Sequence, residues 1–309
     1  MPFVVILNPA AASGRAGRSQ VAIEQAFQAH GVAARFLRTG SPGHAVELAA
    51  EAAASAKAVI AVGGDGTLKE VCEGVIRSGC PVPVGIIPIG TGNDFVRMIG
   101  MPSAPAAAVA ALVGAEVVRV DHGWVRWQGA DTSGRSPFMN AVGIGFDAYT
   151  ADRVASYKRI RGYFGYLLAV LATLRHWKGP VVQVRTQGGA PDLDFDGRLF
   201  LVTAGNGMSS GGGFLLTPNA SITDGLLDVC LVEHAPISRV LQIIPFALQG
   251  THVRAPEVHM HRARTLRIDS EHPLPIHTDG EMLAREAHHI EIEVAAGALS
   301  FLMPVRADT

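Results

Sequence analysis

The sequence predicts an α/β protein, with a doubly wound parallel sheet first and an antiparallel β-sandwich or barrel domain after it. In the first third of the 309 residues, short apolar runs alternate with stretches of helical spacing. This alternation is typical of a parallel sheet covered by helices. After Val120 many short strand-like runs follow, separated by turn signals and with few helices between them, which favours a sandwich or barrel. We place the domain boundary between Val120 and Trp127.

The predicted elements follow in order along the chain. In the first domain, strands are expected at 3–7, 33–37, 59–62, 84–89 and 117–120, and helices at 18–30, 44–55, 68–77 and 104–112. In the second domain, strands are expected at 124–127, 138–142, 181–186, 198–204, 226–232, 265–270 and 289–294, and helices at 151–177 and 237–248. Residues 129–137 are polar and predict a loop.

Composition excludes several classes of protein. The net charge of −1 argues against a nucleic-acid partner, which would need a concentrated basic face. The three cysteines have no CxxC spacing and the histidines no HExxH spacing, so neither a disulfide framework nor a zinc site is expected. No apolar run reaches the length of a membrane span, and residues 1–9 lack a signal-peptide layout. We expect a cytoplasmic protein whose membrane contact is transient and peripheral.

A glycine-rich turn follows the apolar run at 59–62. It reads Gly63-Gly64-Asp65-Gly66-Thr67, and helical spacing begins directly after it. Backbone N–H groups and the helix dipole favour an anion at such a turn, so a phosphate can bind there. Because a carboxylate faces a phosphate productively only with a cation between them, Asp65 implies Mg²⁺. The alternative is a tight turn in which Asp65 caps the helix.

A second loop of the same kind comes about 25 residues later, a spacing typical of one βα unit. It reads Pro88-Ile89-Gly90-Thr91-Gly92-Asn93-Asp94, and a helix should begin at Asn93-Asp94. The two apolar runs are predicted to be neighbouring parallel strands that present both loops at one sheet edge, where open α/β sheets bind ligands.

Together, these two loop motifs resemble those of a known protein family. GGDGT followed by P-x-G-T-x-N-D resembles the diacylglycerol kinase catalytic domain, a group that includes bacterial diacylglycerol kinases, sphingosine kinases and ceramide kinases. The resemblance implies a fold similar to NAD kinases and diacylglycerol kinases, with ATP and Mg²⁺ as cofactors. It implies a catalytic domain at 1–122, on which residues 296–309 pack back, and a lipid-binding domain at 123–295.

The resemblance also implies which residues contact the nucleotide. Asn8 and Pro9 follow the first strand, but Ser13-Gly14 comes two residues later than in the family's N-P-x-S-G segment. Thr39 matches a nucleotide-contacting threonine. The full implied set is Asn8, Pro9, Thr39, Gly63, Gly64, Asp65, Gly66, Thr67, Gly90, Thr91, Asn93 and Asp94.

Asp279-Gly280-Glu281 places two carboxylates on either side of a glycine, a pattern that can supply a general base and its partner. The family's D-G-E occupies this position. The resemblance implies that Glu281 accepts the proton of a lipid hydroxyl beside Asp279, with the exchanged roles left open. It adds Asp65 and Asp121 to the catalytic residues, through the Mg²⁺ network.

The motif from Pro218 to Asp228 has oxygen ligands at cation-binding spacing. The side chain of Asp224 and the carbonyls of Ser221 and Leu226 are the candidate ligands. The resemblance implies a structural Mg²⁺ there, and an Asp-Gly hairpin turn is the alternative. Asn140 to Asp147 resembles another family segment and is expected to line the cleft.

No G-x-x-x-x-G-K-[ST] motif and no protein-kinase signature occurs, so the phosphates must be held by backbone amides, Mg²⁺ and arginine. The predicted function is an ATP-dependent lipid kinase. An NAD kinase-like phosphotransferase and a non-catalytic lipid- or nucleotide-binding regulator are the alternatives. The basic, aromatic stretch 153–178 could face a membrane or form a core helix. A homodimer is left open.

Overall fold

The structure is a computed structural model that describes residues 1–156, 173–189, 191–210 and 213–305. The chain divides into two compact units. Unit 1 comprises Met1–Asp121 and the segment that begins at Ala296, and unit 2 comprises His122–Ala295. Two long strands, β5 (Glu116–Gln128) and β13 (Glu281–Met303), contribute to both units.

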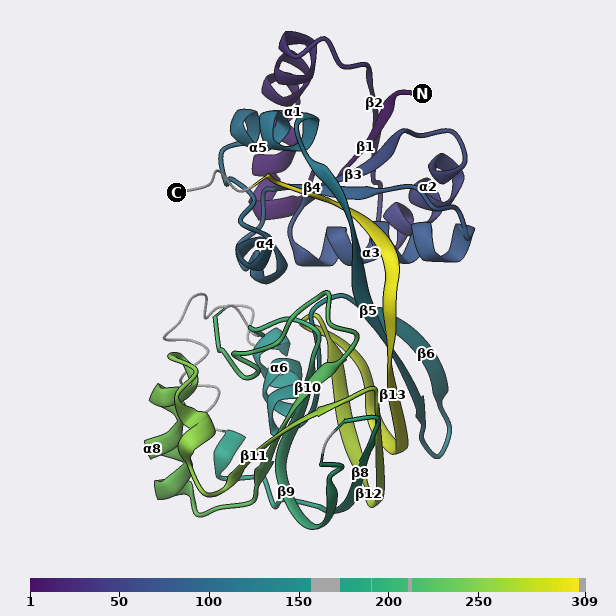
Figure 1. The fold of residues 1–309 in the computed structure, drawn as a ribbon. Coiled ribbons are helices and arrows are strands. Elements are labelled where there is room, and N and C mark those ends of the chain that lie inside the picture. Colours follow the sequence, from purple (N-terminus) through teal and green to yellow (C-terminus); the bar gives the residue numbers. More distant parts are fainter. Residues whose placement is uncertain (157–172, 190, 211–212, 306–309) are drawn as a thin grey trace. The chain divides into compact units, whose positions relative to one another are not determined.

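Unit 1 is built on a parallel sheet. Its strands lie in the order β2 (Ala34–Arg38), β1 (Phe3–Leu7), β3 (Ala58–Gly63) and β4 (Val84–Pro88), and the end of β13 joins beside β4. Its helices are α1 (Ala11–Ala29), α2 (His44–Ala53), α3 (Asp65–Ser78), α4 (Asp94–Ile99) and α5 (Pro105–Val113). Helices α2 and α3 pack together on one face of the sheet, and α1 and α5 on the other (Figure 1).

The apolar runs of the sequence explain this arrangement. Every residue of β1, β3 and β4 is buried, as expected for strands covered by helices on both faces. The doubly wound sheet predicted for the first domain is therefore confirmed, and β3 and β4 are parallel neighbours from Val59 beside Val84 to Gly63 beside Pro88.

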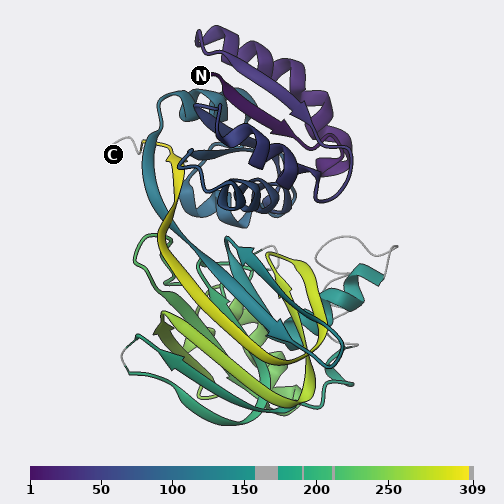
Figure 2. The ribbon, with the colours of Figure 1, turned by 90° about the vertical axis from the view of Figure 1, so that its right-hand side faces the viewer.

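Unit 2 is an antiparallel β domain. Its path of neighbouring strands is β11 (Val258–Ala263), β10 (Leu227–Glu233), β9 (Asp194–Gly205), β7 (Ala141–Gly145), β12 (Thr265–Thr278) and β13. Strand β8 (Val181–Gln187) pairs with β9 and β12, and β6 (Ser133–Phe138) pairs with β5. Figure 2 shows β12 and β13 as long curved neighbours. The inward-facing aliphatic side chains of these strands form one buried core, which confirms the predicted fold class.

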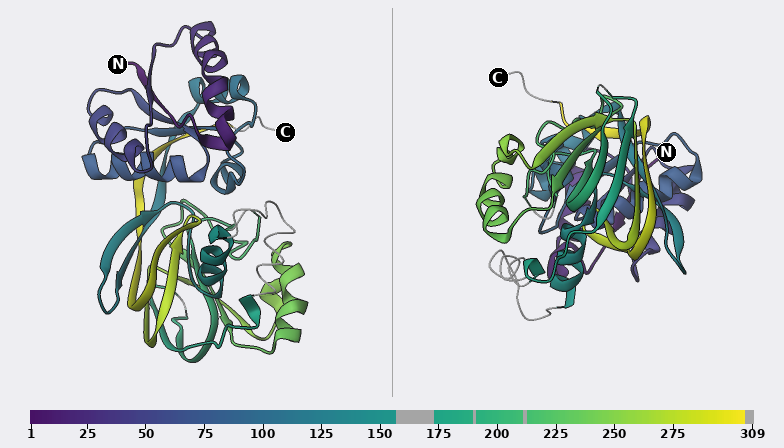
Figure 3. Two further views of the ribbon diagram at one scale, coloured as in Figure 1. Left: turned by 180° about the vertical axis from the view of Figure 1, so that it is seen from behind. Right: turned by 90° about the horizontal axis from the view of Figure 1, so that it is seen from below.

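Helices lie against the strands of unit 2. These are α6 (Phe146–Ser156), α8 (Ile237–Ala247) and the short 3-10 helix η1 (His252–Arg254). Seen from below, α8 lies outside the strand layer (Figure 3). Among the described residues, no helix is both long enough and apolar enough to cross a membrane. The predicted helix at 151–177 and the stretch 153–178 fall largely on residues 157–172, which lie outside the described residues.

Two predictions about unit 2 are wrong. Residues 129–137 are not one loop, because β6 pairs with β5 and the Arg135 guanidinium lies 3.7 Å from the ring centre of Trp124. The strand expected at 138–142 is divided into β6 and β7. It breaks at Met139 and Asn140 because their N–H groups donate to the carboxylate of Asp279 instead of to a neighbouring strand. Strand β11 was not predicted.

Candidate functional site

Both glycine-rich loops leave the carboxyl ends of neighbouring strands in unit 1. Gly64 and Gly90 bring the loops into contact, because a Cβ added to Gly90 would lie 2.5 Å from the Cα of Gly64. A Cβ added to Gly63 would lie 2.4 Å from Thr67 Oγ1. No side chain fits at either position, so these glycines are required by the close approach of the backbone.

Asp65 connects the two loops. Its carboxylate oxygens accept hydrogen bonds from the N–H groups of Asp94 and Phe95, each at 3.2 Å. Asp65 therefore caps α4, the helix that follows the second loop, whereas α3, which begins at Asp65 itself, has no side-chain cap. Asn93 adopts a left-handed conformation with φ of 54°. A non-glycine residue held in this region stores strain, which is common at ligand-binding loops.

The other predicted nucleotide residues lie at the same sheet edge. Asn8 Nδ2 donates to Thr67 Oγ1 at 3.2 Å, and the N–H of Thr39 donates to the Leu7 carbonyl at 3.0 Å. Beside them, Ala12, Ser13 and Gly14 have φ values of 49°, 58° and 84° at the kinked start of α1. Of the remaining predicted members, Pro9 lies in the turn after β1 and Thr91 in the loop after β4, whereas Gly66 and Asp94 lie in the first turns of α3 and α4.

Asp121 and His122 lie on β5 and are both buried. Asp121 Oδ1 accepts a hydrogen bond from the N–H of Gly297 at 2.6 Å, so this carboxylate links β5 to β13 within unit 1. Burial and, to a smaller extent, the charge of Arg135 together lower the pKa of His122 from 6.5 to about 4. The neutral ring of His122 lies edge-on to Trp124, which suits a structural residue.

Asp279 and Glu281 have different surroundings in unit 2. The carboxylate of Asp279 accepts three backbone hydrogen bonds, from the N–H groups of Met139, Asn140 and Ala141, each at 2.9 Å. Asp279 itself has φ of 48°. Glu281 is exposed at the start of β13. The geometry gives Asp279 an anchoring position and leaves Glu281 at the surface.

In the structure, both carboxylate oxygens of Asp224, the side chain predicted to hold a structural cation, are engaged by other groups. Its Oδ1 accepts the N–H of Leu226 at 3.0 Å, and its Oδ2 is paired with the guanidinium of Arg262. Arg262 also lies 3.7 Å from the buried carboxylate of Asp228. Because the arginine already supplies positive charge to this turn, a second cation there would be repelled. Ser221 lies in the same turn, and its hydroxyl is 3.3 Å from that of Thr223.

Among the described residues, no three His, Cys, Asp or Glu side chains come close enough together to hold a metal ion. At the loops, a Cβ added to Gly92 would lie 3.1 Å from Asp65 Oδ2 and 4.0 Å from Asp94 Oδ2, so two carboxylates lie there. This donor set fits Mg²⁺ that arrives with a triphosphate, because such an ion takes one or two carboxylates and completes its shell with phosphate oxygens and water.

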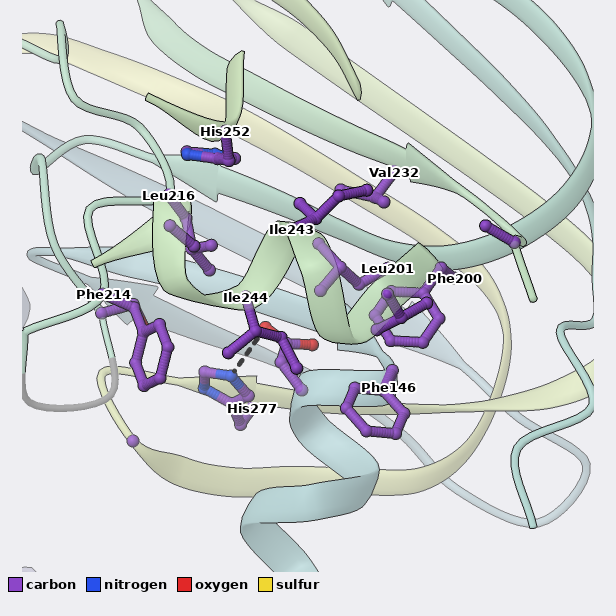
Figure 4. A pocket seen from close by; sticks show the side chains of 16 residues that line it. Phe146, Phe200, Leu201, Phe214, Leu216, Val232, Ile243, Ile244, His252 and His277 are labelled. Carbon is purple, nitrogen blue, oxygen red and sulfur yellow. Dashed lines mark hydrogen bonds and ion pairs between the residues drawn. The ribbon is translucent and has the colours of Figure 1, made fainter. Parts of the chain in front are cut away.

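Unit 2 contains an apolar cavity of about 140 Å³. Its wall combines rings from α6 and β9, aliphatic side chains of α8, and Gly280, the residue between Asp279 and Glu281 (Figure 4). Phe146 and Phe200 stack with ring centres 4.4 Å apart. The cavity is therefore shaped for hydrocarbon and reaches the turn that carries the two carboxylates.

The sequence did not point to the polar pair in this wall. His277 Nε2 lies 3.2 Å from Asp147 Oδ2, and both residues line the cavity. Asp147 was expected to line the cleft, but His277 was not among the predicted site residues. Their pairing depends on β12 lying beside β7, for which the sequence offers no signal.

Comparisons with known proteins identify the family. Residues 2–125 match the diacylglycerol kinase catalytic domain, and residues 140–303 match the YegS C-terminal NAD kinase beta sandwich-like domain. A diacylglycerol kinase of Mycobacterium tuberculosis H37Rv is 32% identical over 83% of this chain and 80% of its own length. The chain belongs to the diacylglycerol kinase family. It is therefore a kinase, a phosphotransferase, as the family resemblance implied.

Two further relatives agree with this assignment. A YegS-like lipid kinase of Pseudomonas aeruginosa PAO1 is 33% identical over 86% of this chain and 83% of its own length. A crystal structure of a Bacillus anthracis protein assigned as a diacylglycerol kinase superposes with a TM-score of 0.77 at 25% identity. The superposition covers 98% of the present chain and 96% of the Bacillus protein. Both units therefore have counterparts in the Bacillus structure.

Proposed function

We propose that this kinase transfers the γ-phosphate of ATP to the hydroxyl of diacylglycerol or a related lipid. The observation that carries the proposal is the apolar cavity of unit 2, whose wall includes Gly280. A hydrocarbon chain gains free energy when it enters such a cavity, about 0.8 kcal/mol for each buried CH₂. The nucleotide NAD offers no comparable hydrocarbon, so the cavity favours a lipid acceptor over the NAD kinase-like alternative.

The loops of unit 1 support ATP as the donor. Backbone N–H groups of glycine-rich turns at the carboxyl ends of β3 and β4 suit a chain of phosphates. Asp65 would hold Mg²⁺ while it keeps the two loops together. Bound with ATP, Mg²⁺ would offset the negative charge of the β- and γ-phosphates.

Glu281 would act as the general base. It takes the proton of the lipid hydroxyl, the hydroxyl oxygen forms a bond to the γ-phosphorus, and the bond from that phosphorus to the bridging oxygen of ADP breaks. Asp279 would not exchange roles with Glu281, because its carboxylate already accepts three backbone hydrogen bonds. It would hold the turn in shape.

Helix α8 would carry the contact with the membrane surface. Its inner side chains Val240, Ile243 and Ala247 line the cavity, while Leu241 and Phe246 are exposed. Apolar side chains on both sides of one helix suit a helix that lies at a lipid interface beside an entrance for hydrocarbon. Peripheral contact of this kind needs no membrane span.

The test is a transfer assay with γ-labelled ATP and Mg²⁺. The purified full chain is incubated with mixed micelles that contain diacylglycerol, phosphatidylglycerol or sphingosine, and separately with NAD. Label on a lipid supports the proposal. Label on NAD alone would instead support the NAD kinase-like alternative. ATP binding with no transfer to any acceptor would support a non-catalytic regulator.

A further inference from the structure

His277 and Asp147 form a polar pair on the wall of the apolar cavity. His277 lies on β12 directly opposite Gly143 of β7. A Cβ added to Gly143 would lie 2.0 Å from Asp147 Oδ2 and 2.2 Å from His277 Nε2. The absence of a side chain at Gly143 is therefore what allows the imidazole and the carboxylate to meet over β7.

The hydrogen bonds of this pair determine which ring nitrogen remains available. Asp147 Oδ1 accepts the N–H of Ala148 at 2.8 Å, and its Oδ2 faces His277 Nε2 at 3.2 Å (Figure 4). A carboxylate only accepts hydrogen bonds, so Nε2 must be the protonated nitrogen. In the neutral ring, Nδ1 then carries a lone pair and acts as an acceptor.

Nδ1 has no hydrogen-bond partner among the residues that the structure describes, and His277 is only 4% exposed. A buried polar atom without a partner costs about 1–3 kcal/mol, and such atoms are rare in native proteins. This one belongs to a side chain on the cavity wall. Its surroundings there include the hydrophobic side chains of Phe146, Phe200 and Phe214.

The other polar side chains of the wall are less suited to a ligand. His252 Nδ1 is also buried without a partner among the described residues, but its ring is held only by a 3.7 Å contact of Nε2 with Cys230 Sγ and not by a carboxylate. Ser210 uses its backbone groups in a bridge to Phe214. His277 therefore offers an acceptor that is held in one orientation by a carboxylate, as in sites that recognise a ligand hydroxyl.

We propose that His277 Nδ1, oriented by Asp147, accepts a hydrogen bond from a hydroxyl or N–H group carried by the hydrocarbon ligand of the cavity. This inference deepens the proposed lipid kinase function and rests on it for the physiological ligand. Since Glu281 would serve the hydroxyl that receives phosphate, the partner of His277 is a second donor. Diacylglycerol has no second donor, so lipids with another hydroxyl or an amide N–H should be better acceptors.

The test measures binding without ATP. Two probes of equal size are titrated into the full chain by calorimetry: 1-octanol, which donates a hydrogen bond, and 1-methoxyheptane, which only accepts. We expect 1-octanol to bind roughly tenfold more tightly to the wild type, as one hydrogen bond of about 1.4 kcal/mol requires. Equal affinities for the two probes would overturn the proposal.

Two variants separate recognition from folding. His277→Phe keeps an aromatic ring and should bind both probes equally, while the control His272→Phe, at an exposed histidine of β12, should keep the preference for 1-octanol. Because His277→Phe leaves the half-buried carboxylate of Asp147 without its imidazole partner, the double variant His277→Phe/Asp147→Asn is made as well. A preference for 1-octanol that survives in a folded His277 variant would contradict the assignment.

The outcome is independent of the transfer assay. A preference for 1-octanol in a protein that phosphorylates no lipid would refute the kinase proposal and leave the recognition by His277 intact. If the protein phosphorylates lipids but binds the two probes equally, the lipid kinase proposal stands and the recognition by His277 is refuted. In an active enzyme, the ratio of kcat/KM between monoacylglycerol and diacylglycerol should fall about tenfold in His277→Phe.

Discussion

Among single residues, Asp279 and Glu281 show how two neighbouring carboxylates acquire different surroundings. The sequence places them on either side of Gly280, and both could serve as a base. In the structure three N–H groups surround the carboxylate of Asp279, whereas Glu281 is exposed. The difference comes from the turn at 139–141, which is about 140 residues away along the chain.

Glu281→Gln should lower kcat about 10²–10⁴-fold, since a positioned general base contributes that much. The substitution keeps the size of an exposed side chain, so the melting temperature should stay unchanged. Transfer rates on saturating lipid and thermal unfolding check both points. The matched control is Glu286→Gln, another exposed glutamate of β13, and equal activity of the two variants would refute the role of Glu281.

The buried Asp228 should make stability depend on pH. Its pKa is raised from 3.8 to about 6, mainly by burial, with the charge of Arg262 opposing the shift and the nearby Asp224 adding to it. The folded state therefore holds a proton that the unfolded state has lost, and stability falls as pH rises from about 4 to about 6. The raised pKa of Asp228 corresponds to a decrease in the free energy of unfolding on the order of 3 kcal/mol across this pH range.

Asp228→Asn should remove this pH-dependent decrease in stability. Its unfolding free energy relative to the wild type should increase as pH rises from about 4 to about 6 and stay level above that range. Subtracting the two curves cancels other titrating groups, including His122. Denaturant unfolding at several pH values measures the difference, with the exposed Asp196→Asn as control. Parallel curves for Asp228→Asn and the wild type would show that Asp228 keeps an ordinary pKa.

Among the elements, the two loops after β3 and β4 act together. The sequence predicted each loop and the neighbouring strands, because glycine-rich turns after apolar runs are local signals. It did not predict that Asp65, in one loop, caps the helix α4 that follows the other. That hydrogen bonding needs the loops in contact, which Gly64 and Gly90 permit.

Gly90→Ala should separate the loops, because its Cβ would lie 2.5 Å from the Cα of Gly64. Forced contacts of this kind cost about 1–3 kcal/mol, so ATP should bind roughly tenfold more weakly. Fluorescent ATP binding and thermal unfolding report the two effects. In the control Gly114→Ala, the nearest atom to the new Cβ is 3.7 Å away. Unchanged ATP affinity in Gly90→Ala would mean that the nucleotide binds elsewhere.

At the level of the whole molecule, the proposed lipid acceptor requires recruitment to a membrane. Leu241→Glu combined with Phe246→Glu should weaken binding to phospholipid vesicles by more than about tenfold, since each exposed apolar side chain contributes roughly 1.5–3 kcal/mol when buried. Sedimentation with vesicles measures the bound fraction. Val117→Glu changes an exposed apolar residue of unit 1 and should bind as the wild type does. If the α8 double variant and Val117→Glu lose vesicle binding equally, α8 is excluded as the segment that contacts the membrane.

The amino-acid sequence predicted the α/β sheet, the β domain, the two glycine-rich loops and the family. These depend on periodicity and on motifs within about 25 residues, where neighbours along the chain are also neighbours in space. Only the tertiary structure decided the anchoring of Asp279 by residues 139–141, the pairing of Arg262 with Asp224, and the meeting of His277 with Asp147. Each of these contacts depends on antiparallel strands or turns from distant parts of the chain, and the register between such strands leaves no local pattern.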